Sequence, residues 1–281
     1  MAAIEVQNFS YIYPGESEAA LRNIHFEVEA GQLFAILGAN GAGKSTLCLA
    51  LAGLIPHLFH GEMNGNVTVL GMNTLKYGPS ELAGKVGLVL QNPANQLSGM
   101  RYTVYEEVAF GLENLGVPSI QMPERIKKAL SWVGLSELGD RSPYALSGGQ
   151  QQRLALASVL ALEPQVLILD EPTAMLDPKG SQEIFEIIHK LTQMGKTVII
   201  AEHRLEWVAC HADRMLVLKE GEAILQGKPA QVMTLPLLKE IGIGWLRYTE
   251  AAYLGKKRNL WLEDMPLPVT LEQAVVGFLR V

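Results

Sequence analysis

The sequence has few cysteines, no long apolar run and no excess of basic residues, and each shortage excludes a class of protein. Its two cysteines, Cys48 and Cys210, lie far apart, so they fit neither a disulfide framework nor a zinc site, and we expect both to be reduced, structural residues. No stretch approaches the roughly 18 apolar residues that a membrane-spanning helix needs. The first apolar run contains Glu5 and has no basic start, so we expect no signal peptide.

The charge balance argues against a nucleic-acid partner. The chain carries 23 Lys and Arg against 29 Asp and Glu, a formal net charge of −6, whereas phosphate backbones attract basic surfaces. Hydrophobic residues make up 48% of the 281 positions and charged residues 19%, as in a well-cored globular protein. This length fits one large domain, or a core domain with a smaller appendage.

Alternation of strand-like and helix-like segments predicts an α/β fold. Three continuous apolar runs, "LFAILG" (33–38), "VLILDE" (166–171) and "KTVIIAEH" (196–203), are typical of buried parallel strands. The opening segments "IEVQNFSYIY" and "LRNIHFEVEAG" alternate apolar with polar residues and predict strands joined by a turn at Pro14-Gly15. We therefore expect a mostly parallel sheet with an N-terminal antiparallel part.

The pattern also suggests how the chain is divided. Helical periodicity and breaks at proline and glycine predict a helical insertion over roughly residues 91–163 of a main domain spanning 1–227. Residues 228–281 have a separate, mostly helical character, with two tryptophans and several leucines. Such a small C-terminal extension can bury a small core or form an interface.

The stretch "GANGAGKST" (38–46) fits the phosphate-loop pattern G-x-x-x-x-G-K-[ST]. Glycines let successive backbone N–H groups turn toward a phosphate, and the following helix presents its positive end to the same anion. Lys44 then reaches the β- and γ-phosphates of ATP, and the Ser45 hydroxyl ligates Mg²⁺. The expected nucleotide-binding residues here are Gly38, Asn40, Gly41, Gly43, Lys44, Ser45 and Thr46.

A buried strand that ends in two carboxylates provides further residues expected to act beside this loop. Asp170 is expected to hold the magnesium through its water shell, and Glu171 to polarise the attacking water as general base. Together the two motifs predict a P-loop NTPase (RecA-like), a class that includes kinases, GTPases, helicases and transport motors.

The stretch "LSGGQQQR" (146–153) narrows the class, because it is the signature of ATP-binding-cassette (ABC) ATPases, which this chain resembles over roughly residues 3–227. "MLD" (175–177) matches the family's D-loop. The resemblance implies catalytic roles for Gln91 and His203, and metal ligation by Gln91 beside Ser45 and Asp170. It also implies an aromatic ring stacked on adenine, either Tyr13 or Tyr11.

The two adjacent glycines of the signature form a second candidate phosphate site. Ser147 is a good helix N-cap, and Gly148 and Gly149 expose backbone N–H groups beside it. In the ABC family the signature lies far from the phosphate loop of its own chain and meets that of a second subunit. The resemblance therefore implies a head-to-tail dimer, homomeric or with a paralogue, in which Ser147, Gly148, Gly149 and Gln150 of one chain complete the ATP site of the other.

Within the family, residues 90–118 and 170–180 resemble the ATPase subunits of energy-coupling-factor (ECF) importers of vitamins or metal ions. That resemblance implies a transmembrane scaffold subunit bound in the groove near Gln91–Glu107, a separate substrate-binding membrane subunit, and a peripheral place on the cytoplasmic face of the membrane. It also implies that the C-terminal extension, residues 228–281, helps to hold two ATPase subunits together. Glu106 and Glu107 are either partners for arginines of the scaffold or a solvated helix face.

The sequence leaves alternatives open, both for the subfamily and for the function. "AEHRLEWVA" (201–209) departs from the more usual Thr-His-Asp form around the histidine, although His203 is retained. A soluble ABC ATPase of DNA repair or translation is the main alternative, although the second cassette or long coiled-coil insertion of those proteins is missing. A degenerate, purely structural nucleotide-binding subunit is the third, and the presence of all the catalytic residues argues against it.

Overall fold

The computed structural model describes residues 2–280, in which ten strands form one sheet with the order β5-β4-β1-β2-β10-β9-β3-β8-β7-β6. The strands are β1 (Ala2–Ile12), β2 (Leu21–Glu29), β3 (Leu33–Gly38), β4 (Glu62–Val69), β5 (Met72–Asn73), β6 (Val86–Val89), β7 (Val166–Asp170), β8 (Thr197–Ala201), β9 (Arg214–Lys219) and β10 (Glu222–Gly227). β9, β3, β8, β7 and β6 run parallel to one another, whereas β1 pairs antiparallel with β2 and β4. The predicted mixed α/β class is confirmed.

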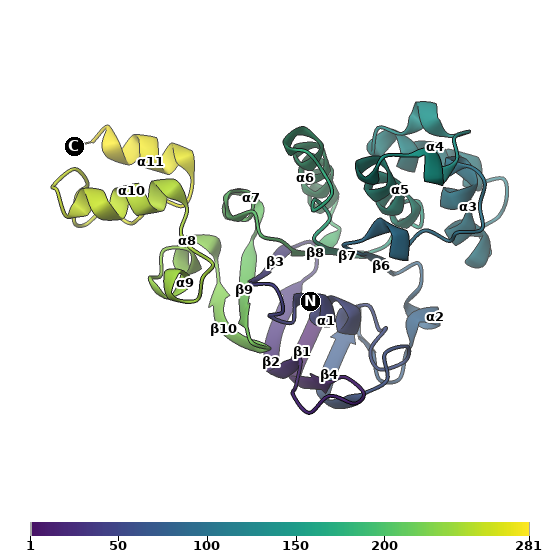
Figure 1. Ribbon diagram of the computed structural model, residues 1–281, viewed down its shortest axis with the longest axis horizontal. Helices are drawn as coiled ribbons and strands as arrows, with labels where there is room; N and C mark the ends of the chain where they lie inside the picture. Colours follow the sequence, from purple (N-terminus) through teal and green to yellow (C-terminus); the bar gives the residue numbers. More distant parts are fainter. Residues whose placement is uncertain (1, 281) are drawn as a thin grey trace.

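Helices cover both faces of the parallel strands (Figure 1). They are α1 (Lys44–Leu51), α2 (Pro79–Leu82), α3 (Val104–Asn114), α4 (Met122–Trp132), α5 (Gly148–Leu160), α6 (Pro178–Gln193), α7 (Leu205–His211), α8 (Pro229–Val232), α9 (Leu237–Glu240), α10 (Arg247–Lys256) and α11 (Leu271–Phe278). None of these helices of residues 2–280 is both long enough and apolar enough to cross a bilayer.

β3 carries no polar side chain and is buried at every position, because both of its faces are covered. Along β3, Leu33 and Leu37 join one hydrophobic cluster, and Phe34 and Ile36 join the other. Successive side chains of a strand point to opposite faces, so a continuous apolar run feeds two cores at once. This is the physical reason why such runs predict buried strands.

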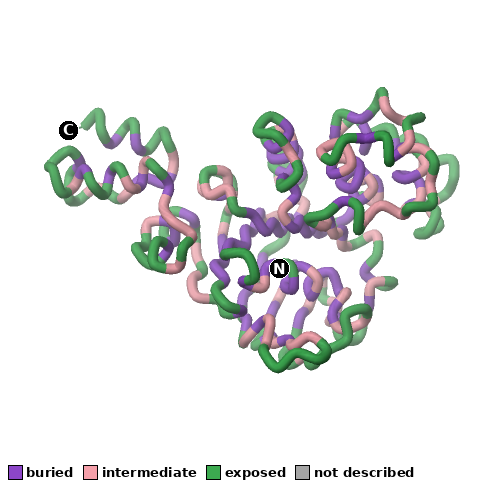
Figure 2. The backbone as a smooth tube through the Cα atoms, in the orientation of Figure 1, coloured by how far each residue is buried: buried purple, intermediate pink, exposed green. Residues whose placement is uncertain are grey.

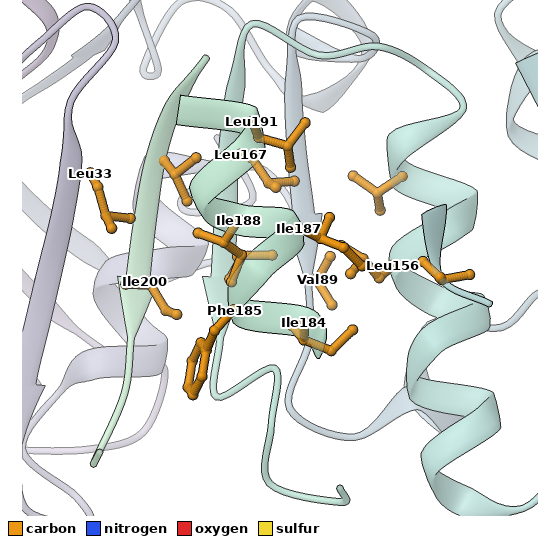
Figure 3. Packing of buried hydrophobic residues seen from close by; sticks show 14 of the residues in the cluster. Leu33, Val89, Leu156, Leu167, Ile184, Phe185, Ile187, Ile188, Leu191 and Ile200 are labelled. Carbon is orange, nitrogen blue, oxygen red and sulfur yellow. The ribbon is translucent and has the colours of Figure 1, made fainter. Parts of the chain in front are cut away.

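The first core lies between the sheet and the long helices. In α6, Ile184, Ile187, Ile188 and Leu191 recur at helical spacing and pack toward strand residues such as Leu167 (Figure 3). The second core lies between the parallel strands, α1 and the antiparallel strands β1, β2 and β4. α1, which begins at the phosphate loop, is therefore held on the face opposite α6.

The two ends of the molecule are helical (Figure 1). The region 91–163 contains α3, α4 and α5, which pack on one another at one end. At the other end α10 and α11 form a hairpin around Trp261. A Cβ at Gly277 would overlap the end of the Trp261 indole ring, so the ring packs directly against the backbone of α11. Most residues of this hairpin are exposed or intermediate in burial, in contrast to β3, β7 and β8, which are buried throughout (Figure 2). Both cysteines are free; Cys48 is buried, whereas Cys210 is exposed and does not have the packed position expected for it.

Candidate functional site

The phosphate loop connects the end of β3 to the start of α1, as its sequence predicts. Gly43, the N-cap of α1, has a φ of 101°, in the left-handed region that L side chains rarely adopt. Gly38 is required for a different reason, since a Cβ there would lie 2.7 Å from the carbonyl oxygen of Leu218. The loop leads directly into the positive N-terminal end of α1, where an anion is favoured.

Four charged or polar side chains meet beside this loop. The Lys44 ammonium donates to the carbonyl oxygen of Gly38 at 3.0 Å and lies 3.3 Å from Glu171 Oε1. Gln91 Nε2 donates to Glu171 Oε2 at 2.8 Å, and His203 Nε2 lies 2.7 Å from Glu171 Oε1. The structure thus brings together side chains from the start of α1 and from the segments that follow β6, β7 and β8, which are far apart in the sequence.

The contacts of His203 indicate where its proton lies. Nε2 has two neighbours, Glu171 Oε1 at 2.7 Å and Lys44 Nζ at 3.2 Å. A carboxylate only accepts hydrogen bonds and an ammonium only donates them, so one ring nitrogen cannot satisfy both. The shorter contact assigns the proton to Nε2, which donates to Glu171. The imidazole is then oriented by the carboxylate on which the predicted chemistry depends.

The backbone of Glu171 separates its side chain from that of Asp170. Glu171 has a φ of 48°, a left-handed conformation that costs a non-glycine residue free energy. Its N–H donates to the carbonyl oxygen of Ala201, so the chain leaves the sheet immediately after Asp170. Backbone strain at a polar residue beside a ligand-binding loop is typical of functional sites.

Asp170 fits a bound cation. It is buried, and its Oδ1 has no hydrogen-bond partner within the described part of the chain. Burial raises the pKa of the Asp170 carboxyl, although a hydrogen bond with the Ser45 side chain and the charge of Lys44 act in the opposite direction. A buried, charged oxygen without a partner is costly unless a metal ion or its water shell supplies one. Ser45, Asp170 and Gln91 are the residues that would hold Mg²⁺ here.

Asp170→Asn is expected to stabilise the metal-free protein at pH 7 by about 1 kcal/mol, because it removes a buried charge. A pKa that is raised on folding means that Asp170 disfavours the folded state increasingly as pH rises through that pKa. The gain should therefore be smaller near pH 4 than at pH 7, as measured by urea unfolding in EDTA. Mg²⁺-dependent ATP hydrolysis should be lost in the same variant. A destabilised variant at pH 7 would show that Asp170 is held by other contacts.

The residues predicted to bind nucleotide line one hollow of ≈ 560 Å³, within the range of about 300–1,000 Å³ found for small-molecule sites. Its walls are formed by Tyr13, Ala20, Asn40, Gly41, Gly43, Lys44, Ser45, Thr46, Gln91, Glu171 and His203. Gly38 and Asp170, which were also predicted to act at this site, are not part of its lining. The Tyr13 hydroxyl is 3.1 Å from Thr46 Oγ1, whereas Tyr11 is fully buried and donates to the carbonyl oxygen of Phe59. Tyr11 is therefore excluded as the ring that stacks on adenine, and Tyr13 is the aromatic residue of the hollow.

The signature motif opens a separate hollow. Ser147 is the N-cap of α5 and accepts a hydrogen bond from the N–H of Gln150, and the Gln150 side chain accepts one from the N–H of Ser147. A Cβ at Gly148 would meet no atom within 4 Å. Among residues 2–280, the lining of this hollow (Gly134, Leu135, Ser147, Gly149, Gln150, Arg153, Met175, Leu176, Asp177) shares no residue with the hollow of the phosphate loop. The two predicted phosphate sites of one chain are distinct.

One of the two glutamates considered as partners of a membrane subunit does not have that role. Glu107 is buried, and its carboxylate accepts hydrogen bonds from both the N–H and the hydroxyl of Ser98. Glu106 instead caps α3 by accepting from the N–H groups of Tyr102 and Thr103. Adjacent positions on a helix point about 100° apart, so one glutamate turns inward while its neighbour caps the helix end.

Two polar residues beside the site are absent from the sequence prediction. Thr173 and Glu202 are both buried, and the Thr173 hydroxyl donates to a carboxylate oxygen of Glu202. Glu202 could have been identified from the sequence, because it directly precedes His203 and stands where the more usual form has threonine. No sequence signal indicates that Thr173 reaches it.

Comparisons with known proteins show what the chain as a whole is similar to. The model of a family described as ABC transporter matches residues 21–174. A protein of Pyrococcus horikoshii described as an ABC transporter ATP-binding protein is 46% identical over 262 residues, covering 92% of each chain. The structure of CbiO1 from Clostridium perfringens, described as part of the ABC transporter complex CbiONQ, superposes with a TM-score of 0.73 at 34% identity, covering 91% of this chain and 99% of that one. A dimeric ATP-binding cassette in a post-hydrolysis state with ADP and Pi has a TM-score of 0.71 at 28% identity, covering 80% of this chain and 98% of its own.

Proposed function

The chain belongs to the ABC transporter family, and on that premise we propose that it is the ATP-hydrolysing subunit of an ECF-type importer of a vitamin or a transition-metal ion. As a family member it is an ATPase that binds ATP with Mg²⁺, and such ATPases dimerise and pair with transmembrane components. The finer assignment to an importer of this type is supported by the similarity to CbiO1, which covers 91% of the chain.

The site geometry supports a division of roles among the residues of one chain. Lys44 and the N–H groups of the phosphate loop bind the phosphates of ATP, and Ser45, Asp170 and Gln91 hold Mg²⁺. When bound, the metal neutralises charge that develops on the phosphates. Glu171 takes the proton of the attacking water, which fits a carboxylate placed by hydrogen bonds from both Gln91 and His203.

The second half of each site comes from a second subunit. This is supported by the separation of the signature hollow from the phosphate-loop hollow within one chain. Ser147, Gly148, Gly149 and Gln150 of one subunit then complete the site of the other, so ATP holds the two sites closed and hydrolysis lets them open. The transport motor works by closing and reopening this dimer.

A surface beside Gln91 is suited to the membrane scaffold. Met100 and Tyr102 are exposed by 67% and 85%, and a Cβ at Gly99 would lie 3.4 Å from the Tyr144 hydroxyl. The loop that carries them is anchored at Gln96, whose side chain bonds to the backbone at both Leu90 and Ala155. Exposed apolar side chains on a fixed loop are typical of an interaction surface, and this one adjoins the catalytic glutamine.

This assignment predicts that the tagged chain purifies from detergent-solubilised membranes of its source organism together with a membrane-spanning scaffold and a separate membrane-embedded binding protein. Tyr102→Glu is expected to lower the recovery of the scaffold by about tenfold, because a charge replaces an apolar contact at the interface. Ile120→Glu is the matched control, since Ile120 is equally exposed but lies on the loop between α3 and α4. Recovery of nucleic acid or ribosomes in place of membrane proteins would contradict the transport function.

The C-terminal extension, from residue 228 onward, is proposed as a second contact between the two ATPase subunits. Leu271, Val275 and Leu279 recur every four residues on or next to α11, and all three are exposed. A helix with an apolar stripe on its outer face is suited to pack against another copy of itself. The subunit pair would then persist when the ATP sites open, at the cytoplasmic face of the membrane.

A further inference from the structure

Glu202 is a buried carboxylate that the ATP-binding hollow does not include. It follows β8 directly and precedes His203, and only 3% of its surface is exposed. A charged side chain is rarely buried to this degree without specific partners. Its own N–H donates to the carbonyl oxygen of Ile36 at 3.2 Å, so its backbone is fixed to the end of β3.

The carboxylate accepts three hydrogen bonds from two different segments. Oε2 accepts from the backbone N–H groups of His203, at 2.7 Å, and Arg204, at 3.1 Å. Oε1 accepts from the Thr173 hydroxyl. The first two bonds set the direction in which the chain leaves β8. The third joins this turn to the segment that follows β7.

Thr173 lies in the turn immediately after Glu171. In that turn the N–H of Ala174 donates to the carbonyl oxygen of Glu171, and the N–H of Leu176 donates to that of Thr173. The Glu202 carboxylate therefore connects the turn that begins with Glu171 to the turn that begins with His203. The side chains of these two residues approach to 2.7 Å in the hollow.

We propose that Glu202 is a positioning residue, whose carboxylate joins the two turns and thereby sets the contact between Glu171 and His203 on which hydrolysis depends. The inference rests on the proposed roles of Glu171 and His203. A threonine at this position, as in the Thr-His-Asp form, carries one hydroxyl on Cβ and is too short to bond both turns at once. Glutamate has two oxygens at the end of a longer side chain, and one serves each turn.

Glu202→Ala is expected to lower kcat by about tenfold or more, while the KM and Kd for ATP change by less than about threefold, because phosphate-binding groups are left in place. Glu202→Gln is expected to retain at least about a third of kcat, since its amide oxygen still accepts from both N–H groups and its amide nitrogen can donate to Thr173. Thr173→Val should fall between the two. The measurements are steady-state phosphate release and equilibrium nucleotide binding.

Thr249→Val is the matched control for Thr173→Val. Thr249 is also buried and donates its hydroxyl to a backbone oxygen, that of Pro268, but it lies in the C-terminal extension. Loss of the Thr249 hydroxyl is expected to lower the melting temperature and to leave kcat within about twofold. A general loss of stability would affect the two threonine variants alike, whereas a positioning role affects only Thr173.

The double variant Glu202→Ala with His203→Ala separates positioning from other effects, measured by single-turnover hydrolysis. If Glu202 acts through His203, the double variant is no slower than His203→Ala alone. Independent, additive losses would overturn the proposal, as would wild-type kcat in both Glu202→Ala and Thr173→Val. If Glu202→Ala does not fold, Thr173→Val decides alone, and a loss of kcat in Thr173→Val no larger than that in Thr249→Val, at equal melting temperatures, would also overturn the proposal. Wild-type turnover in His203→Ala would instead refute the proposed role of His203.

Discussion

Glu171→Gln is expected to lower the rate of ATP hydrolysis by about 10²–10⁴-fold, the range that a positioned general base contributes. The substitution keeps the shape of the side chain, and the amide oxygen can still accept the hydrogen bond that Gln91 donates. An amide cannot take a proton from water at neutral pH, so ATP binding persists while turnover stops. The subunits should then accumulate as an ATP-bound dimer. Phosphate release and light scattering after gel filtration, with and without MgATP, measure both effects.

Glu163→Gln is a close control for this variant. Glu163 also has a left-handed backbone, with a φ of 56°, but it pairs with Lys128 on the surface away from the hollow. Its replacement should leave turnover within about twofold, because surface ion pairs contribute little. Dimers of Glu171→Gln that form without nucleotide would indicate that the C-terminal extension holds the two subunits together. A variant that hydrolyses ATP like the wild type, or that stays monomeric in MgATP, would contradict the proposed closure of the dimer by ATP.

Gly149→Asp is expected to lower ATP hydrolysis and ATP-driven dimerisation together, by an order of about 10²-fold, as found when a preorganised donor to a reacting anion is lost. The carboxylate would repel the phosphate at the N-terminus of α5, although an acidic residue in a first helical turn favours the helix itself. A Cβ at Gly149 would lie 3.1 Å from the end of the flexible Leu176 side chain, so the fold can adjust. ATP affinity of the isolated chain should stay within about threefold, because Gly149 does not line the phosphate-loop hollow.

Mixing two inactive variants tests whether the site is shared. In a dimer of Lys44→Ala with Gly149→Asp, one site carries both defects and the other carries neither. Random pairing of a two-fold symmetric dimer should then restore about a quarter of wild-type turnover if the sites act independently. Gly139→Asp is the control for the added charge, since a Cβ there would meet no atom closer than 3.9 Å. Full activity of Gly149→Asp by itself would show that the signature does not contact ATP.

Much of the fold and of the site could be predicted because the motifs obey local rules. A glycine with positive φ before a helix, a six-residue apolar run and an N-cap serine followed by glutamine at the third helical position each depend on a few neighbouring residues. The structure accordingly places the phosphate loop at the start of α1 and Ser147 at the N-cap of α5. The end of a buried strand likewise puts Asp170 and Glu171 at the carboxyl edge of the sheet, where ligands of α/β folds bind.

Other features depend on segments that meet only in three dimensions. Tyr11 and Tyr13 are two positions apart and point to the same side of an extended chain, yet only Tyr11 is covered, by a loop 48 residues away. Glu107 turns inward because Ser98 lies next to it in the folded chain, and Glu202 meets Thr173 across 29 residues.

The sequence by itself thus determined that this chain binds ATP with Mg²⁺ and resembles ABC ATPases, because catalysis at phosphates requires fixed residue types at short, fixed spacings. Only the tertiary structure decided which aromatic ring faces the nucleotide, which acidic residues are free to meet a partner, and that the signature and the phosphate loop open separate hollows. The physical reason is that burial is a collective property. Whether a side chain is covered depends on which distant segments pack over it, and no local pattern specifies them.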